Sequence, residues 1–312
     1  MSAFVVVNPR SANGRTRSDW PQIEPALRTI YPDMTVGFTT APNQATALVR
    51  AALQAGHDEI VAIGGDGTIN EAINGMFDAQ GPLAPTAVFG FVTSGTGGDF
   101  RKSFGISSGH AAAIARLAEA PIRAIDIGRV SCVSTSGLSI VRHFANIASF
   151  GLSGLIVKSV NRARIAKLFG GQFAFAFHSA AVMLFHRDFP VHLCSGEEFD
   201  VTTPISTVAI ANGQYFGGGM WVAPGASPDD GLFDTVIVGG VPRVQMLKDM
   251  KRLYEGGHIN DPNVRIVRAQ KITVTPVAET SERPVFIETD GELAGQLPAT
   301  FEILPRALNV RC

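Results

Sequence analysis

The chain has 312 residues, which is enough for two domains or for one large one. Charged residues make up 17% and apolar residues 46%, so the sequence can form sizeable cores and global disorder is excluded. The net charge of −1 excludes a generally basic nucleic-acid-binding protein. The 33 glycines follow no collagen-like period, so we expect them to serve local turns and loops.

Signals for export or membrane insertion are weak. The N-terminus has no basic start before its short apolar run, which argues against a signal peptide. The most apolar long stretch, residues 173–185, is too short to span a bilayer. The three cysteines are widely spaced and form no zinc-binding pattern. We therefore expect a cytoplasmic protein, with peripheral association at the inner membrane face left open.

The first 120 residues alternate between strand-like and helix-like patterns. Apolar and β-branched runs predict strands at residues 3–7, 34–38, 59–63 and 87–92. Apolar residues three and four positions apart predict helices at 20–30, 45–53, 69–77 and 110–120. This alternation is typical of a parallel sheet covered by helices, so we predict a Rossmann-like α/β fold for this part.

The pattern changes after Pro121, where strand-like runs dominate. We predict strands at 122–130, 139–149, 205–212, 232–238, 264–268, 271–276, 284–289 and 300–304, and helices at 155–169, 173–185 and 244–254. Many short strands joined by turns favour an antiparallel β-sandwich. We therefore predict one domain at 1–125 and a second at 126–312, whose last residues can return to the first.

The most informative glycines lie at residues 64–71, with the sequence GGDGTINE, between a predicted strand and a predicted helix. Thr68 and Glu71 match a capping box, which predicts a helix that starts just after the glycines. Free N–H groups at a helix N-terminus favour an anion such as phosphate. Asp66 is better suited to hold Mg²⁺ than to contact phosphate. An ordinary strand–helix turn, capped locally by Asp66, is the alternative.

Two further polar loops, at residues 8–15 and 94–100, also follow predicted strands. Because ligands bind beyond the carboxyl ends of parallel strands, we expect the three loops to converge on one edge of the sheet. The glycine loops match neither the Walker A motif nor the GxGxxG fingerprint. A phosphate site here would therefore depend on backbone N–H groups, hydroxyls, a metal ion and Arg10 or Arg15.

Acidic residues mark two places in the second half. Glu288, Asp290 and Glu292 alternate, so an extended strand would point all three to one face, where mutual repulsion could create a base. A hairpin turn at Asp290-Gly291 is the alternative, and the two interpretations are compatible. The pair at residues 229–230 suits Mg²⁺ or Ca²⁺ as well as a simple turn.

Residues 155–185 combine basic and aromatic side chains. Four cations (Lys158, Arg162, Arg164 and Lys167) precede four phenylalanines (Phe169, Phe173, Phe175 and Phe177). This combination suits an anionic membrane surface. A core element with a solvated helix face is the alternative.

Ordered motifs run along nearly the whole chain, from residue 5 to about 295. They are Asn8-Pro9-x-Ser11, Phe38-Thr39-Thr40, GGDGTxNE at 64–71, Ser94-Gly95-Thr96 with Asp99-Phe100, Asn212-Gly213, the glycines at 217–219, Ala223-Pro224, Asp229-Asp230-Gly231 and Asp290-Gly291-Glu292. Together they resemble the catalytic domain of the diacylglycerol kinase and sphingosine kinase family, and most closely its bacterial lipid kinases.

The resemblance implies an N-terminal domain of the NAD kinase and diacylglycerol kinase type, a C-terminal β-sandwich that takes the lipid, and ATP in the cleft between them. The residues it places around the nucleotide are Asn8, Pro9, Arg10, Ser11, Ala12, Thr39, Gly65, Asp66, Gly67, Thr68, Asn70, Glu71, Thr96 and Asp99. Asp66 would act near the catalytic Mg²⁺, and Asp290 would be the general base, with Glu292 as a third catalytic acid. A second, structural metal would bind the backbone carbonyls of Ser227 and Leu232 and the carboxylate of Asp230.

The sequence departs from the family at Gly98, where many members have Asn. The leading interpretation is an ATP-dependent, Mg²⁺-requiring lipid kinase that phosphorylates a hydroxyl of a lipid such as diacylglycerol at a membrane surface. We expect no nucleic-acid partner, and a homodimer stays open. The alternatives are an NAD kinase-like enzyme with a soluble substrate and a non-catalytic nucleotide or lipid sensor.

Overall fold

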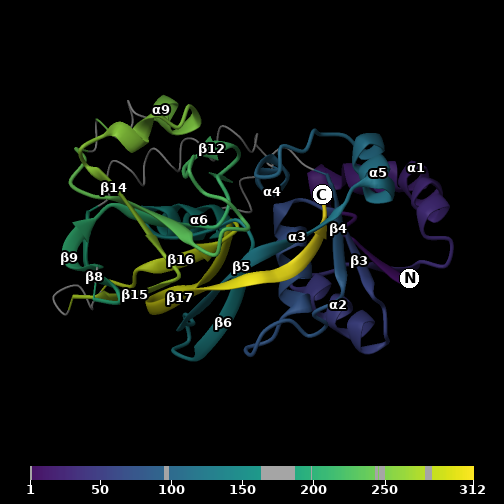
Figure 1. Ribbon diagram of the computed structural model, residues 1–312, viewed down its shortest axis with the longest axis horizontal. Coiled ribbons are helices and arrows are strands. Elements are labelled where there is room, and N and C mark those ends of the chain that lie inside the picture. Colours follow the sequence, from purple (N-terminus) through teal and green to yellow (C-terminus); the bar gives the residue numbers. More distant parts are fainter. Residues whose placement is uncertain are drawn as a thin grey trace.

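The computed structural model describes residues 2–94, 98–162, 187–197, 199–242, 245, 250–277 and 283–312. Figure 1 shows an N-terminal half with α1 to α5 and a C-terminal half rich in strands. The elements of the first half are β1 (Ala3–Val7), the 3-10 helix η1 (Ser11–Gly14), α1 (Arg15–Ile30), β2 (Thr35–Phe38), α2 (Gln44–Gln54), β3 (Glu59–Gly64), α3 (Asp66–Met76), β4 (Val88–Thr93), α4 (Asp99–Lys102) and α5 (His110–Glu119).

The elements of the second half are β5 (Ile122–Val133), β6 (Ser139–Phe144), β7 (Ile147–Gly151), α6 (Leu152–Arg162), β8 (Phe189–Ser195), β9 (Phe199–Ile205), β10 (Thr207–Ala211), β11 (Tyr215–Phe216), β12 (Met220–Trp221), β13 (Phe233–Val238), α9 (Met250–Tyr254), the 3-10 helix η3 (Gly257–Asn260), β14 (Val264–Ala269), β15 (Lys271–Pro276), β16 (Phe286–Thr289) and β17 (Glu292–Arg311). Within the described residues, no helix is long and apolar enough to cross a membrane.

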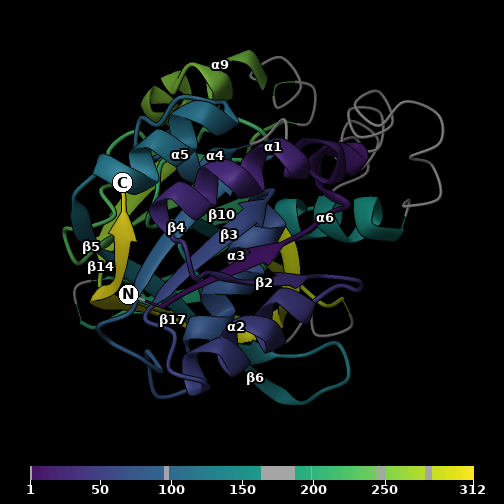
Figure 2. The ribbon, with the colours of Figure 1, turned by 90° about the vertical axis from the view of Figure 1, so that its right-hand side faces the viewer.

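The N-terminal half is a parallel sheet in the order β2-β1-β3-β4 with helices on both faces. Alternate residues of β1 point to opposite faces, as the pleat of a strand requires. Phe4 and Val6 pack with residues of α2 and α3, whereas Val5 and Val7 pack with residues of α1 and α5. Figure 2 shows α1 and α5 on one side of these strands and α2 on the other. The predicted α/β fold is confirmed.

The last strand, β17, links the two halves. Most of it pairs antiparallel with β5, β15 and β16, but Asn309 and Val310 pair in parallel with β4. Figure 1 shows β17 crossing from the C-terminal half to β4. At its end, Arg311 donates to the buried carboxylate of Glu59 at 3.0 and 3.2 Å. Strands of both halves therefore belong to one hydrogen-bonded mixed sheet.

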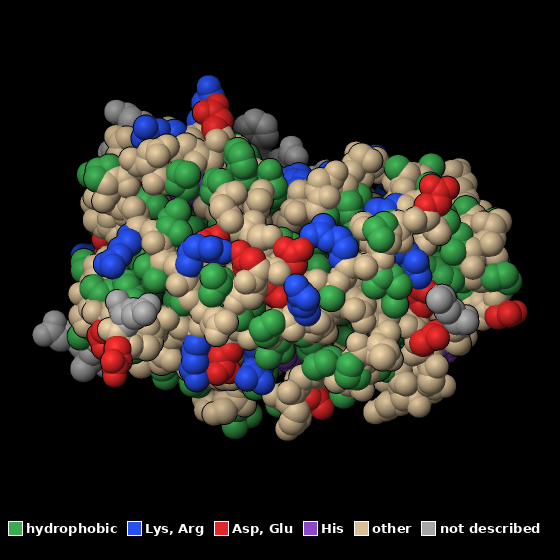
Figure 3. All heavy atoms as spheres, viewed as in Figure 1, with side chains coloured by type: hydrophobic (Ala, Val, Ile, Leu, Met, Phe, Trp, Pro, Cys, Tyr) green, Lys and Arg blue, Asp and Glu red, His purple; other side chains and the backbone are tan. Residues whose placement is uncertain are grey.

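The C-terminal half is an antiparallel sandwich around an apolar core that includes Phe144, Phe150, Phe233 and Phe301. The hairpin β8–β9 was not predicted, and the strand expected at 139–149 is interrupted at residues 145–146. Figure 3 shows basic, acidic and apolar side chains intermixed on one face of the molecule, which agrees with the net charge near zero.

Candidate functional site

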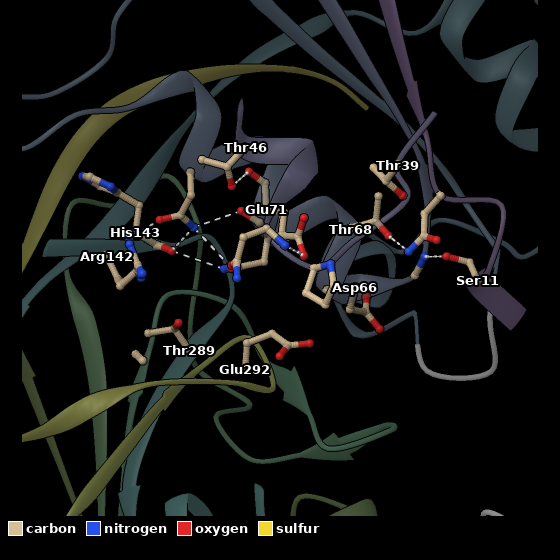
Figure 4. A pocket seen from close by; sticks show the side chains of 18 of the residues that line it. Ser11, Thr39, Thr46, Asp66, Thr68, Glu71, Arg142, His143, Thr289 and Glu292 are labelled. Atoms are coloured by element: carbon tan, nitrogen blue, oxygen red, sulfur yellow. Dashed lines mark hydrogen bonds between the residues drawn. The ribbon is translucent and has the colours of Figure 1, made fainter. Parts of the chain in front are cut away.

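A cleft of about 2210 Å³ is lined by residues of both halves. Pockets for a single small ligand usually measure roughly 300–1,000 Å³, so this cleft has room for more than one ligand. The N-terminal half contributes the loops after β1, β2, β3 and β4, and the C-terminal half contributes β5, β6 and the start of β17. Figure 4 shows labelled side chains from both halves around this cleft.

Most of the residues expected around the nucleotide line this cleft. They are Asn8, Arg10, Ser11, Ala12, Thr39, Gly65, Asp66, Gly67, Thr68, Asn70 and Glu71. Glu292 also lines it, whereas Pro9, Asp99 and Asp290 are not among the lining residues. Thr96 lies outside the described residues.

The loop after β1 is tied to the first turn of α3. Asn8 donates through Nδ2 to Thr68 Oγ1 at 3.0 Å, and the N–H of Gly65 donates to Ser11 Oγ at 3.3 Å. Helix α3 begins at Asp66, so the N–H groups of Asp66 and Gly67 have no acceptor inside the helix. This is the geometry of an anion site at a helix N-terminus.

The capping box expected at Thr68 and Glu71 is wrong. The helix begins two residues before Thr68, and Gly65 is the N-cap. Glu71 instead accepts the N–H groups of Asn43 at 2.8 Å and Ala45 at 3.1 Å. Because it faces α2, Glu71 caps that neighbouring helix and fixes the loop after β2 beside the cleft.

Asp66 is partly buried and lies next to a second acid, Asp99. Its Oδ2 accepts the N–H of Gly98 at 2.9 Å, and its Oδ1 accepts that of Phe100 at 3.4 Å. Burial raises the pKa of Asp66, and the charge of nearby Asp99 raises it further. Two adjacent carboxylates in a desolvated place gain from a shared cation. Both Asp66 oxygens already accept N–H groups, and Asp99 pairs with Lys102 at 3.4 Å, so the Mg²⁺ expected at Asp66 would bind through the lone pairs that these contacts leave.

Gly98 performs a backbone role where many family members carry an amide side chain. It has a left-handed φ of +62°, and its N–H donates to Oδ2 of Asp66. A Cβ at this position would lie 2.6 Å from Nε of Arg101, so that side chain would have to move to accept any larger residue.

Asp290 lies in the turn between β16 and β17, with φ of +48°, followed by Gly291 at +87°. The predicted hairpin turn is thus confirmed, and the turn breaks the expected alternation of three acids on one face. Asp290 Oδ2 accepts from Asn70 Nδ2 at 2.9 Å and from the N–H of Ala145 at 3.0 Å. Its Oδ1 accepts the N–H groups of Asn146 and Ile147, both at 3.0 Å.

These four donors fill the acceptor sites of one carboxylate. They also explain the break in the strand expected at 139–149, because the N–H groups at 145 and 146 bind Asp290. The pKa of Asp290 is raised above its ordinary value, because the effect of burial exceeds the opposing effect of the four hydrogen bonds. Asp290 therefore anchors the turn to β7 and to α3.

Glu292 is the acid of this turn that reaches the cleft. A Cβ placed on Gly67 would lie only 2.9 Å from Glu292 Oε1, so the carboxylate rests against the first turn of α3. Figure 4 shows its side chain extending from β17 in the direction of Asp66. The N-terminal end of α3, with Asp66, thus lies against Glu292 of the other half.

The residues expected to hold a structural metal lie together in the loop before β13. Asp230 already pairs with Arg268 of β14, and its Oδ1 accepts the N–H of Leu232 at 3.0 Å. Ser227 donates to Asp229, which pairs with Arg123. Among the described residues, no group of three or more His, Cys, Asp or Glu side chains could hold a metal. Arg268 occupies one oxygen of Asp230, and the structural metal expected at Ser227, Asp230 and Leu232 stays a prediction.

Asn74 and His143 are cleft residues that the sequence did not single out. Asn74 Nδ2 donates to the carbonyl of His143 at 2.8 Å, and Asn74 Oδ1 accepts its N–H at 2.9 Å. Burial lowers the pKa of His143 to about 4, so its ring is neutral at pH 7. The four-residue spacing of Asn70 and Asn74 on one helix face was the available signal, since both amides bind the carbonyl of His143.

The basic and aromatic stretch at 155–185 lies largely outside the described residues, which stop at 162 and resume at 187. Within α6, the ammonium of Lys158 lies 3.5 Å from the ring centre of Phe286. This cation is therefore engaged inside the protein, and the remaining cations and phenylalanines of the stretch stay a prediction.

Comparisons with known proteins agree with the fold and the cleft. The model of the diacylglycerol kinase catalytic domain matches residues 2–130, and that of the YegS C-terminal NAD kinase beta sandwich-like domain matches 146–312. The diacylglycerol kinase of Bacillus subtilis is 28% identical, over 99% of this chain and 95% of its own. "Probable lipid kinase YegS-like" of Pseudomonas fluorescens is 30% identical, over 89% and 85%.

Two solved structures share the fold. A diacylglycerol kinase from Bacillus anthracis superposes with a TM-score of 0.71 at 21% identity, over 99% of this chain and 96% of that one. Yeast NADH kinase reaches 0.53 at 14% identity, over 99% and 78%. Fold, cleft and relatives together define a lipid kinase. The chain belongs to the family of bacterial diacylglycerol kinases and YegS-like lipid kinases.

Proposed function

We propose that the protein transfers the γ-phosphoryl group of ATP to a hydroxyl group of a membrane lipid, with diacylglycerol as the leading acceptor. The observation that carries this proposal is the convergence of the α3 N-terminus, Asp66 and Glu292 in one cleft. The names of the relatives support a lipid acceptor over the soluble substrate of an NAD kinase. Retention of all these acids counts against a non-catalytic sensor.

The nucleotide phosphates would bind at the first turn of α3, within reach of the loop that holds Asn8, Arg10 and Ser11. When bound at Asp66, with Asp99 behind it, Mg²⁺ would neutralise charge on the phosphates. Positioning and charge stabilisation are the main requirements of phosphoryl transfer, and the two halves supply both across the cleft.

Glu292, and not Asp290, takes the proton in this proposal. The acceptor oxygen attacks the γ-phosphorus, the bond to the bridging oxygen of ADP breaks, and the hydroxyl proton passes to the Glu292 carboxylate. Asp290 would have to give up one of four donors to accept a proton, whereas Glu292 lines the cleft. Asp290 therefore positions the base.

A lipid acceptor must be reached at a membrane surface, and no described helix crosses one. We therefore propose that the protein is cytoplasmic and binds peripherally to the inner face of the membrane. Binding to vesicles with and without anionic lipid, at low and high salt, tests it, because electrostatic attraction falls as salt screens it. Salt-independent binding would contradict an electrostatic attachment.

The central experiment supplies labelled ATP and Mg²⁺ with a panel of lipids and with NAD. We expect label in a lipid, and a product from NAD alone would establish the soluble-substrate alternative. Glu292→Gln should lower kcat by about 10²–10⁴-fold, the usual contribution of a general base, without loss of nucleotide affinity. Near-normal turnover in that variant would remove Glu292 from this role.

A further inference from the structure

Glu288 is a carboxyl group inside the C-terminal sandwich, on β16, with no exposed surface. Its Oε2 accepts the N–H of Gly291 at 2.8 Å, so Glu288 contacts the turn at residues 290–292 directly. Its Oε1 bonds to the hydroxyl of Ser149, the residue opposite it on β7. Ser149 in turn lies 2.7 Å from the hydroxyl of Ser153 in the first turn of α6.

Among the described residues, the hydrogen bonds of the Glu288 carboxyl come from a hydroxyl group and a backbone N–H, and not from a basic side chain. The groups packed against it on β7 and α6 are the neutral hydroxyls of Ser149 and Ser153, and Lys158 of α6 lies over the ring of Phe286. The charged groups nearest to it, Asp290 and Glu292, are acids. Burial, with these two acids, raises the pKa of Glu288 to about 8, so the group carries a proton at neutral pH.

We propose that Glu288 works as a neutral carboxylic acid that positions the 290–292 turn, and that loss of its proton at alkaline pH displaces this turn and stops phosphoryl transfer. The protonated group donates through Oε1 to Ser149 and accepts from Gly291 through Oε2. An ionised group would place a third negative charge beside Asp290 and Glu292 in a desolvated site. The proposal rests on the function proposed above, since the displaced turn carries the base.

Glu288→Gln tests the proposal, because an amide keeps one donor and one acceptor but cannot ionise. Wild-type kcat should fall about tenfold per pH unit above pH 8. The Gln variant should have wild-type kcat at pH 7, and its kcat should begin to fall at a pH at least one unit higher than that of wild type. Exposed Glu255→Gln is the matched control and should follow wild type. If kcat of Glu288→Gln falls at the same alkaline pH as kcat of wild type, the proposal is overturned.

A stability series separates this proposal from the proposed function. A raised native pKa stabilises the fold fully below the unfolded pKa, and this contribution is lost as pH rises through about 8. Thermal midpoints of wild type should therefore fall between about pH 5 and pH 8, the range from the unfolded pKa to the native one, and those of Glu288→Gln should fall less. Equal pH dependence of the two midpoints would show that Glu288 holds no proton, even if no lipid substrate is found.

Discussion

Two turns lie at the cleft, one from each half, and backbone N–H groups play opposite parts at them. At the start of α3, the N–H groups of Asp66 and Gly67 point beyond the helix and have no acceptor within it. At the 290–292 turn, three N–H groups of residues 145–147 are spent on the Asp290 carboxylate. The first turn leaves N–H donors for the phosphate that we propose there, and the second turn carries an acid that N–H groups hold in place.

The largest effect is expected at the first turn, from Asp66→Asn. Loss of the carboxylate that would hold Mg²⁺ removes several kcal/mol of charge stabilisation, which is about a hundredfold or more in kcat. Steady-state rates across a Mg²⁺ titration measure it. Asp33→Asn, an exposed acid far from the cleft, is the control. If Asp66→Asn keeps more than about a tenth of the activity, the metal does not depend on this side chain.

Asp290→Asn should act through the fold of the second turn. Asn tolerates the left-handed φ at this position. Its side-chain NH₂ group, however, is a donor and would face backbone N–H groups that now donate to a carboxylate oxygen. We expect a loss of about 1–3 kcal/mol in the free energy of unfolding, with nucleotide affinity retained. Urea denaturation of Asp290→Asn beside wild type measures the difference. Full stability with no activity in Asp290→Asn would return the role of base to Asp290.

Gly67→Ala tests the contact between the two turns. The added methyl would lie 2.9 Å from Glu292 Oε1, so the carboxylate must move away from the helix. We expect kcat to fall about tenfold, the rate equivalent of roughly 1.4 kcal/mol, with thermal stability unchanged. Gly257→Ala, where a Cβ meets no atom within 4 Å, is the control. Equal rates in the two variants would show that the position of Glu292 does not matter.

The sequence predicted the parallel half of the fold well because β1, β3 and β4 are buried on both faces and read as continuous apolar runs. The hairpin β8–β9 was missed because Pro190 and Pro204, which face each other in the register, interrupt the pattern that signals a strand. Strand β17 was predicted only at 300–304, since Gly295, Pro298 and Pro305 disguise its full length of 20 residues.

The sequence predicted which residues form the candidate site, but it did not predict the role of each acidic residue in it. The family resemblance implied that Asn8, Asp66 and Glu292 share one cleft, and all three line the cleft in the structure. Which acid is enclosed by four donors depends on the backbone of residues 145–147, more than 140 positions away. The pattern of acids within one strand cannot report such contacts, so the sequence offered no reason to move the role of base from Asp290 to Glu292.

The smallest effect is expected from Glu71→Ala, at the far side of the first turn. Glu71 accepts the N–H groups of Asn43 and Ala45, so its removal leaves the N-terminus of α2 without these acceptors. A lost helix cap costs about 1 kcal/mol in the free energy of unfolding, which urea denaturation without nucleotide can resolve. Glu24→Ala, which removes an i,i+4 pair with Arg28 on α1, should cost about 0.3–0.5 kcal/mol. If the two variants lose the same stability, Glu71 is no more than another surface acid, and the loop after β2 owes its position to contacts other than this one.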